Sequence, residues 1–236
     1  MNQQIQILHI KKQLGLSIVE LMVTLVLSLF IMLVTTGFYI NNKTTYRFID
    51  SSSEVQENGR YAIHFLRENI ANAGFPRIDT TIKPFPTALP PTNATGPNNS
   101  DQISVSYQAT QDCLGANVVG TVTSTFAVDA NNNLTCNGTA LIAGVENLQI
   151  EYGVDTDLFP ADNIPNTYRA ADTVGNWDNV VAVRLAILIA GQTQVRDQAS
   201  AETYQLLSTS YTAPNDRLHR RVFTTTIGLR NSDPDA

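Results

Sequence analysis

The residues whose types and spacing most clearly suggest chemistry stand where a glycine meets a long apolar stretch that contains one carboxylate. Gly15 precedes Leu16, and Glu20 follows four residues later. If the Gly15–Leu16 bond were cleaved, the new α-amino group would lie about one helical turn from the Glu20 carboxylate. Glu20 would then neutralise this amine in its own helix or in the next subunit of an assembly. In an assembly, such pairing would set the register between subunits.

The apolar stretch itself is long enough to cross a membrane. Glu20 is its one charged residue from Leu16 to Ile40. As a helix, the stretch extends about 37 Å at about 1.5 Å per residue, against a hydrocarbon core of roughly 30 Å. Placing an acidic side chain inside a membrane costs on the order of 2.5 kcal/mol or more. A carboxylate in such a segment therefore indicates a functional role. An ordinary signal anchor remains an alternative, and a cleaved secretory signal fits less well because its apolar core should be shorter.

Other candidate sites are weaker. Calcium could bind oxygens of Asp155, Asp157 and Asp162, but the spacing lacks the glycine and glutamate of an EF-hand. Aspartates also favour turns for local reasons, and a turn is the preferred interpretation. The histidines His9, His64 and His219 form no Ser-His-Asp pattern or zinc motif. We therefore expect no catalytic residues, no metal and no cofactor.

The cysteines and a basic cluster bear on structure and partners. Cys113 and Cys136 show no metal-binding spacing, so outside the cytoplasm they would form one disulfide, with two buried thiols as the alternative. The sequence also clusters positive charge late in the chain, at Arg217, Arg220 and Arg221. This cluster is either a contact with a partner or a charged strand edge that discourages pairing.

Composition and charge limit the classes of function. The chain has 236 residues and a formal net charge of −6, so bulk electrostatics argue against binding nucleic acid. Lys11 and Lys12 precede the apolar run and should stay in the cytoplasm. The domain that follows would then lie in the periplasm of a Gram-negative cell. Its length of roughly 160 residues is enough for one core.

The sequence predicts one long helix followed by an antiparallel sheet, an α+β fold. Apolar residues from Val55 to Ala73 recur at helical spacing, and Gly74 with Pro76 ends the pattern. The helix is therefore predicted from Leu16 to Ala73, with a membrane half over residues 16–40 and a second half over 41–74 that packs on the head. Alternating or apolar segments predict strands in the head (75–236), at 103–108, 119–128, 134–142, 145–154, 180–190, 204–211 and 222–229.

The N-terminal pattern and three later segments resemble a known protein family. A basic leader ends at Gly15 before an apolar residue, with glutamate at the fifth position of the shortened chain. This pattern resembles the class III signal of type IV pilins and type II secretion pseudopilins, although Leu16 stands where phenylalanine is usual. The segments 56–75, 144–155 and 218–231 resemble PilW-type minor pilins more specifically.

The resemblance implies a processing route and a set of partners. Residues 1–15 would be a leader removed by a prepilin peptidase, the Leu16 amine would be methylated, and Glu20 would act in subunit docking. The protein would reside in the inner membrane and then enter an extracellular pilus. It would prime assembly at or near the tip, with other minor pilins, the major pilin and a tip adhesin as partners.

Two other functions stay open at this point. A type II secretion pseudopilin shares the N-terminal signal, and only the PilW-like segments argue against it. A membrane-anchored binding module or adhesin that never polymerises would keep the Gly15–Leu16 bond intact and tolerate substitution of Glu20.

Overall fold

The computed structural model describes residues 15, 17–76, 82–157 and 163–231. The chain divides into two compact units, residues 1–46 and 47–236. One helix, α1 (Ile18–Ala71), contributes residues to both units. Its bounds lie within two residues of the predicted helix at either end. The leader, including Lys11 and Lys12, and Leu16 lie outside the described residues.

In the first unit, α1 begins at a serine cap and keeps its polar side chains bonded to its own backbone. The Val19 amide donates to Ser17 Oγ at 3.4 Å, as expected of an N-cap. Four side-chain hydroxyls within the apolar run each donate to a backbone carbonyl oxygen one turn earlier. They belong to Thr24, Ser28, Thr35 and Thr36. In lipid, where water is absent, such bonds would satisfy these hydroxyl groups.

The same part of α1 has the composition of a membrane span. Its most apolar part is exposed throughout, with no share buried within the protein. Among the described residues, α1 is the one helix that is long and apolar enough to cross a bilayer. An apolar surface this large is stable only against lipid or other apolar helices.

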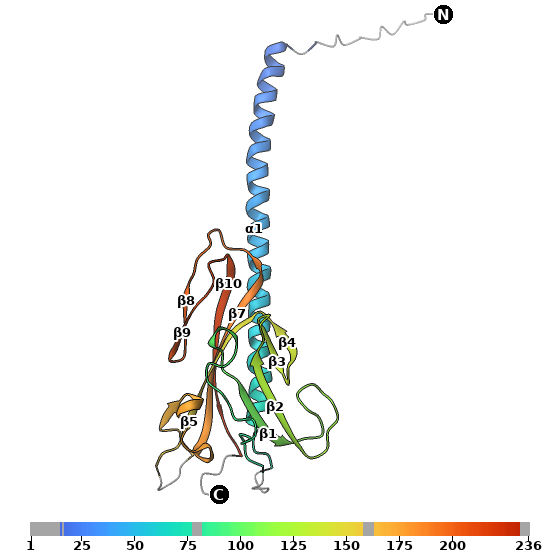
Figure 1. Cartoon of the computed structure of the whole chain (residues 1–236). Helices are drawn as coiled ribbons and strands as arrows, with labels where there is room; N and C mark the ends of the chain where they lie inside the picture. Colours follow the sequence, from blue (N-terminus) through green and yellow to red (C-terminus); the bar gives the residue numbers. More distant parts are fainter. Residues whose placement is uncertain (1–14, 16, 77–81, 158–162, 232–236) are drawn as a thin grey trace, which may run out of the picture. The chain divides into compact units, whose positions relative to one another are not determined.

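The second unit is an α+β head in which strands pack on the second half of α1 (Figure 1). One antiparallel sheet has the order β1-β2-β3-β4, a second has the order β10-β7-β5-β6, and β8 pairs with β9. The bounds are β1 (Ile103–Gln108), β2 (Thr121–Val128), β3 (Asn133–Cys136), β4 (Thr139–Ala143), β5 (Val145–Val154), β6 (Thr167–Arg169), β7 (Val180–Gln194), β8 (Thr203–Leu206), β9 (Thr209–Thr212) and β10 (Leu218–Gly228).

The main core lies between α1 and one face of the sheets. The predicted helical stripe is buried there, including Val55, Ala62, Leu66 and Ile70. From β7, the alternate residues from Val183 to Ile189 face the same core. Asn69 on α1 accepts a hydrogen bond from the Tyr107 hydroxyl at 2.7 Å, so a polar pair inside the core is satisfied.

Two glycines let α1 approach the second sheet closely. A Cβ at Gly59 of α1 would overlap the ring of Phe223 on β10. A Cβ at Gly191 of β7 would overlap the Ser51 hydroxyl of α1. The absence of side chains at these two points therefore fixes where the helix crosses β7 and β10.

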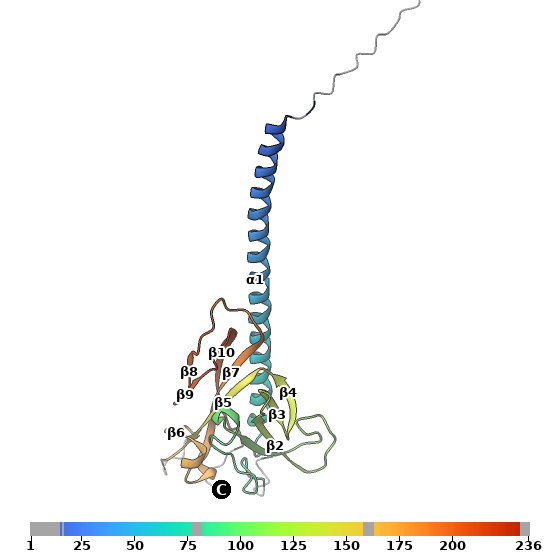
Figure 2. The same cartoon turned by 45° about the horizontal axis from the view of Figure 1, so that its top comes forward.

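The opposite face of the second sheet is covered by the β8–β9 hairpin. Leu206 packs on Ala186 and Leu188 of β7, with Val222 of β10 at its border. Figures 1 and 2 both show β8 and β9 beside β7 and β10, on the side away from α1. The β7 strand is thus buried on both faces, which explains why its sequence is almost continuously apolar.

The structure corrects two strand predictions and adds one strand. The segment 134–142 forms two strands, because Asn137 and Gly138 both adopt positive φ and make a tight turn. The segment 204–211 is likewise a hairpin, with its turn at Leu207 (φ 56°). The short β6 strand was not predicted.

A buried ion-pair network ties β10 to β5. Arg220 is 6% exposed and donates to both oxygens of Glu146, at 2.7 and 2.9 Å. It also donates to Asp216, at 2.7 and 2.6 Å. These bonds hold the pKa of Asp216 below its usual 3.8. Because the folded pKa lies below the unfolded one, the resulting stability is present at neutral pH and is lost as the pH falls below about 4.

We predict that Gly59→Val destabilises the head, because its side chain must displace the Phe223 ring. Overpacking of this kind costs roughly 1–3 kcal/mol of unfolding free energy. Gly228→Val is the matched control, since a Cβ there meets open space. Urea unfolding in detergent, followed by fluorescence of Trp177, the chain's one tryptophan, measures both. Equal stability of the two variants would show that the close approach is not needed.

We also predict that Arg220→Met destabilises the head by roughly 3–5 kcal/mol, because it leaves the buried Glu146 carboxylate without its partner. The exposed neighbour Arg221 serves as the control, and Arg221→Met should cost less than about 1 kcal/mol. The same unfolding assay measures both variants. Similar small losses would contradict a structural role for Arg220.

Candidate docking sites

The predicted docking carboxylate lies at the start of the apolar helix. Glu20 is exposed in the first turn of α1, where a negative charge is favoured by the helix dipole. Gly15 is exposed and precedes the helix. This end of the chain can present one carboxylate in an otherwise apolar surface. Cleavage at Gly15–Leu16, methylation of Leu16 and docking through Glu20 stay predictions.

The two cysteines form the predicted disulfide. Cys113 lies in the loop between β1 and β2, and Cys136 is the last residue of β3. The bond closes a separation of 23 residues, for which the chain-entropy model gives about 3 kcal/mol of stabilisation. Cys136 is fully buried and contributes to the core. The bond therefore secures a long loop to the first sheet.

The weak calcium candidates are placed only in part. Asp155 follows β5 and is buried, and it accepts a hydrogen bond from the Asp157 amide at 3.3 Å. Asp162 lies outside the described residues. Within the ranges that the structure describes, no group of three or more acidic, histidine or cysteine side chains is arranged to hold a metal. The short-range bond is typical of the turn that was the preferred interpretation.

The three clustered arginines do not share one environment. Arg220 is buried in the network with Glu146 and Asp216, so it is not available to a partner. The partner contact predicted for Arg220 is therefore wrong. Arg217 and Arg221 are exposed. For these two, a partner contact stays a prediction. The sequence shows the density of charge but not that the middle arginine turns inward.

His219 occupies a position on β10 that the sequence did not suggest. Its ring packs against Phe48 of α1, with the ring centroids 5.2 Å apart. Burial, together with nearby Arg196 and Arg221, lowers the pKa of His219 below its usual 6.5. The imidazole is therefore mainly neutral at neutral pH and closes one stretch of the boundary between α1 and β10.

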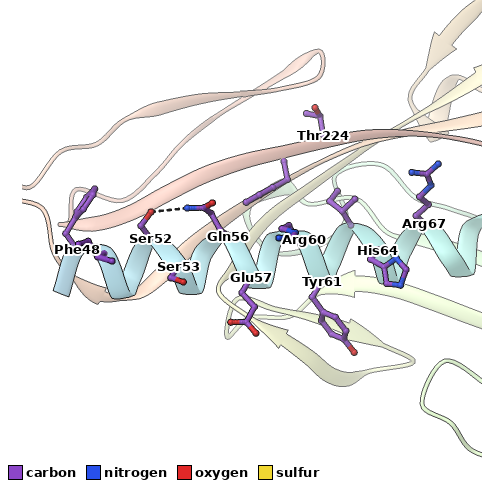
Figure 3. Close-up of a pocket in the computed structure, with 13 residues that line it drawn as sticks. Phe48, Ser52, Ser53, Gln56, Glu57, Arg60, Tyr61, His64, Arg67 and Thr224 are labelled. Carbon is purple, nitrogen blue, oxygen red and sulfur yellow. Dashed lines mark hydrogen bonds between the residues drawn. The ribbon is translucent and has the colours of Figure 1, made fainter. Parts of the chain in front are cut away.

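A groove beside this contact is the site that sequence reasoning missed. It has a volume of about 1130 Å³ and runs along α1 next to Phe223 and Thr224 of β10 (Figure 3). Its apolar lining includes Phe48, Ile49 and Tyr61, which are 43%, 58% and 53% exposed. The signal in the sequence was these apolar residues outside the buried stripe.

The comparisons with known proteins identify the family of the chain. The family model described as Type IV Pilus-assembly protein W matches residues 114–231, half of the chain. No curated protein matches significantly. Among solved structures, a type IV-like pilin from Thermus thermophilus aligns with a TM-score of 0.43 and 14% sequence identity, covering 77% of this chain and 97% of the other. The chain belongs to the family of type IV pilus-assembly protein W, and its apolar N-terminal helix fits a membrane-anchored component of the pilus.

Proposed function

We propose that this chain is a minor pilin that primes assembly of a type IV pilus and stands at or near its tip. The observation that carries the proposal is the exposed apolar half of α1, which begins beside Glu20, in a chain of this family. A helix with this surface needs other apolar helices once it leaves the membrane. A bundle of pilin stems supplies them, and the role is structural rather than enzymatic.

The proposed route starts in the inner membrane. Residues 1–15 stay in the cytoplasm with Lys11 and Lys12, and the head lies in the periplasm. Prepilin peptidase cleaves after Gly15, and the Leu16 amine is then methylated. In the bundle, Glu20 meets the amine of a neighbouring stem, which removes the cost of an unpaired carboxylate in an apolar environment.

The proposed partners divide between the two units. The first unit supplies contacts that any pilin stem can make, so it joins the major pilin and other minor pilins alike. The second unit supplies surfaces of its own, and these select companion minor pilins and a tip adhesin. This division follows from the contrast between an unbroken apolar helix and a head whose exposed surface is polar and varied.

A strain that lacks the chain tests the assignment to the pilus. We expect loss of surface pili with normal type II secretion, measured by shearing pili and by assaying secreted proteins. If the chain primes assembly, deleting the retraction ATPase as well should partly restore pili. Intact pili with lost secretion would instead make the chain a secretion pseudopilin, and neither defect would favour a non-polymerising binding module.

We predict that Glu20→Ala leaves membrane insertion and cleavage intact but strongly reduces incorporation into pili, because docking loses its one carboxylate. Ser28→Ala, in the same apolar run, is the control and should be incorporated normally. Immunoblots of membranes and of sheared pili measure both steps. Normal incorporation of the Glu20 variant would argue against its docking role.

A further inference from the structure

The groove beside α1 borders a strand with an unused edge. In the second sheet β10 is terminal and, among the described residues, pairs with β7 alone. The Leu229 amide donates to Val181 of the β7 region at 2.8 Å. Because backbone groups alternate in direction along an antiparallel strand, those of Val222, Thr224 and Thr226 point away from β7. Thr224 also lines the groove.

The geometry of the groove suits an extended segment. One wall is α1, and the other is the free edge at Phe223 and Thr224. Figure 3 shows Arg67 extending from α1 on the side where Thr224 lies, whereas Glu57 and Tyr61 extend from the other side of the helix. A segment placed against β10 would hydrogen-bond to its backbone and lie beside Phe48, which Figure 3 shows on the same side of α1 as Thr224.

The charges around the groove indicate what the segment carries. Arg60 and Arg67 line the groove, and the Arg221 guanidinium lies 5.5 Å from the Phe223 ring centroid. None of these three has an ion-pair partner among the described residues. By contrast, four other cations of the head are paired with carboxylates, namely Lys83, Arg184, Arg196 and Arg220. Glu57 also lines the groove but extends from the opposite side of α1 to Arg67, so the side that borders Thr224 is locally basic and complementary to an acidic ligand.

We propose that an extended acidic segment of a companion protein binds this groove as an added strand on β10. Backbone hydrogen bonds to the edge at Thr224 supply affinity. Carboxylates that reach Arg60 and Arg67 supply selectivity, and alternate apolar side chains pack against the partly exposed ring of Phe48. The inference rests on the proposed function for where the companion is met, but the contact itself is measurable on the purified chain.

The first test uses a synthetic probe and the full chain in detergent micelles. The probe is a fluorescent octapeptide that alternates valine and glutamate, and anisotropy measures its binding. We expect this probe to bind at least tenfold more tightly than a peptide that alternates valine and lysine. Its affinity should fall as the salt concentration increases. A proline in the middle of the probe should abolish binding, since it removes a strand hydrogen bond. Equal binding of the two charged peptides would overturn the proposal.

Variants of the chain separate the charge contribution from strand pairing. Arg60→Glu combined with Arg67→Glu should lower the affinity for the probe at least tenfold. Arg169→Glu, on the β6 edge of the same sheet, should leave this affinity unchanged. Thr224→Pro removes an amide from the open edge and should also weaken binding tenfold. Thr224→Val keeps that amide and should bind normally. Thermal unfolding checks that all variants remain folded.

Two results would assign the groove to another occupant. If the arginine variant weakens binding but Thr224→Pro does not, the ligand docks through side chains, as a helix would, and strand addition is wrong. If the chain self-associates in sedimentation and Thr224→Pro abolishes this, a second copy occupies the groove. Neither result depends on pilus assembly, so failure of this inference is distinct from failure of the proposed function.

Discussion

The head depends on the close packing of α1 against β7 and β10. A helix can lie this near a sheet only where side chains are missing, and Gly59 and Gly191 supply the two gaps. Phe223 fills the space over Gly59, and the buried stripe of α1 then meets the core face of β7. The same crossing leaves the next turns of α1 beside the free edge of β10. The position of the groove is therefore a consequence of how the core packs.

Charge in the head is organised by burial. Inside, Arg220 is surrounded by Glu146 and Asp216, because a buried guanidinium is stable only when its donors are satisfied. Arg196 pairs with Glu202 beside the β8–β9 hairpin. The arginines along the groove have no such partners in the described structure. Internal pairs fix one fold, whereas unpaired surface cations remain available for recognition by another molecule.

Sequence patterns predicted the elements whose burial is simple. The 3.6-residue period of α1 and the long apolar β7 are direct consequences of facing a core, and both were predicted. The Asn137–Gly138 turn was missed although its residues are a strong hairpin signal, whereas the turn at Leu207 has no such signal. The burial of Arg220 depends on its contact with Glu146, which lies far from it in the chain. The groove likewise joins residues of α1 and β10. No local sequence pattern contains such contacts.

The division of one helix between two environments explains how a pilus component can be both interchangeable and specific. In its apolar half, side chains offer nearly uniform packing, and Glu20 is the single charged group, on which the proposed docking depends. In its second half, one face of α1 packs in the core, as at Leu66, and other residues line the groove, as at Arg67. Under the proposed function, different partners contact the apolar half of α1 and the groove, so substitutions in the groove should alter partner choice while the stem keeps its contacts.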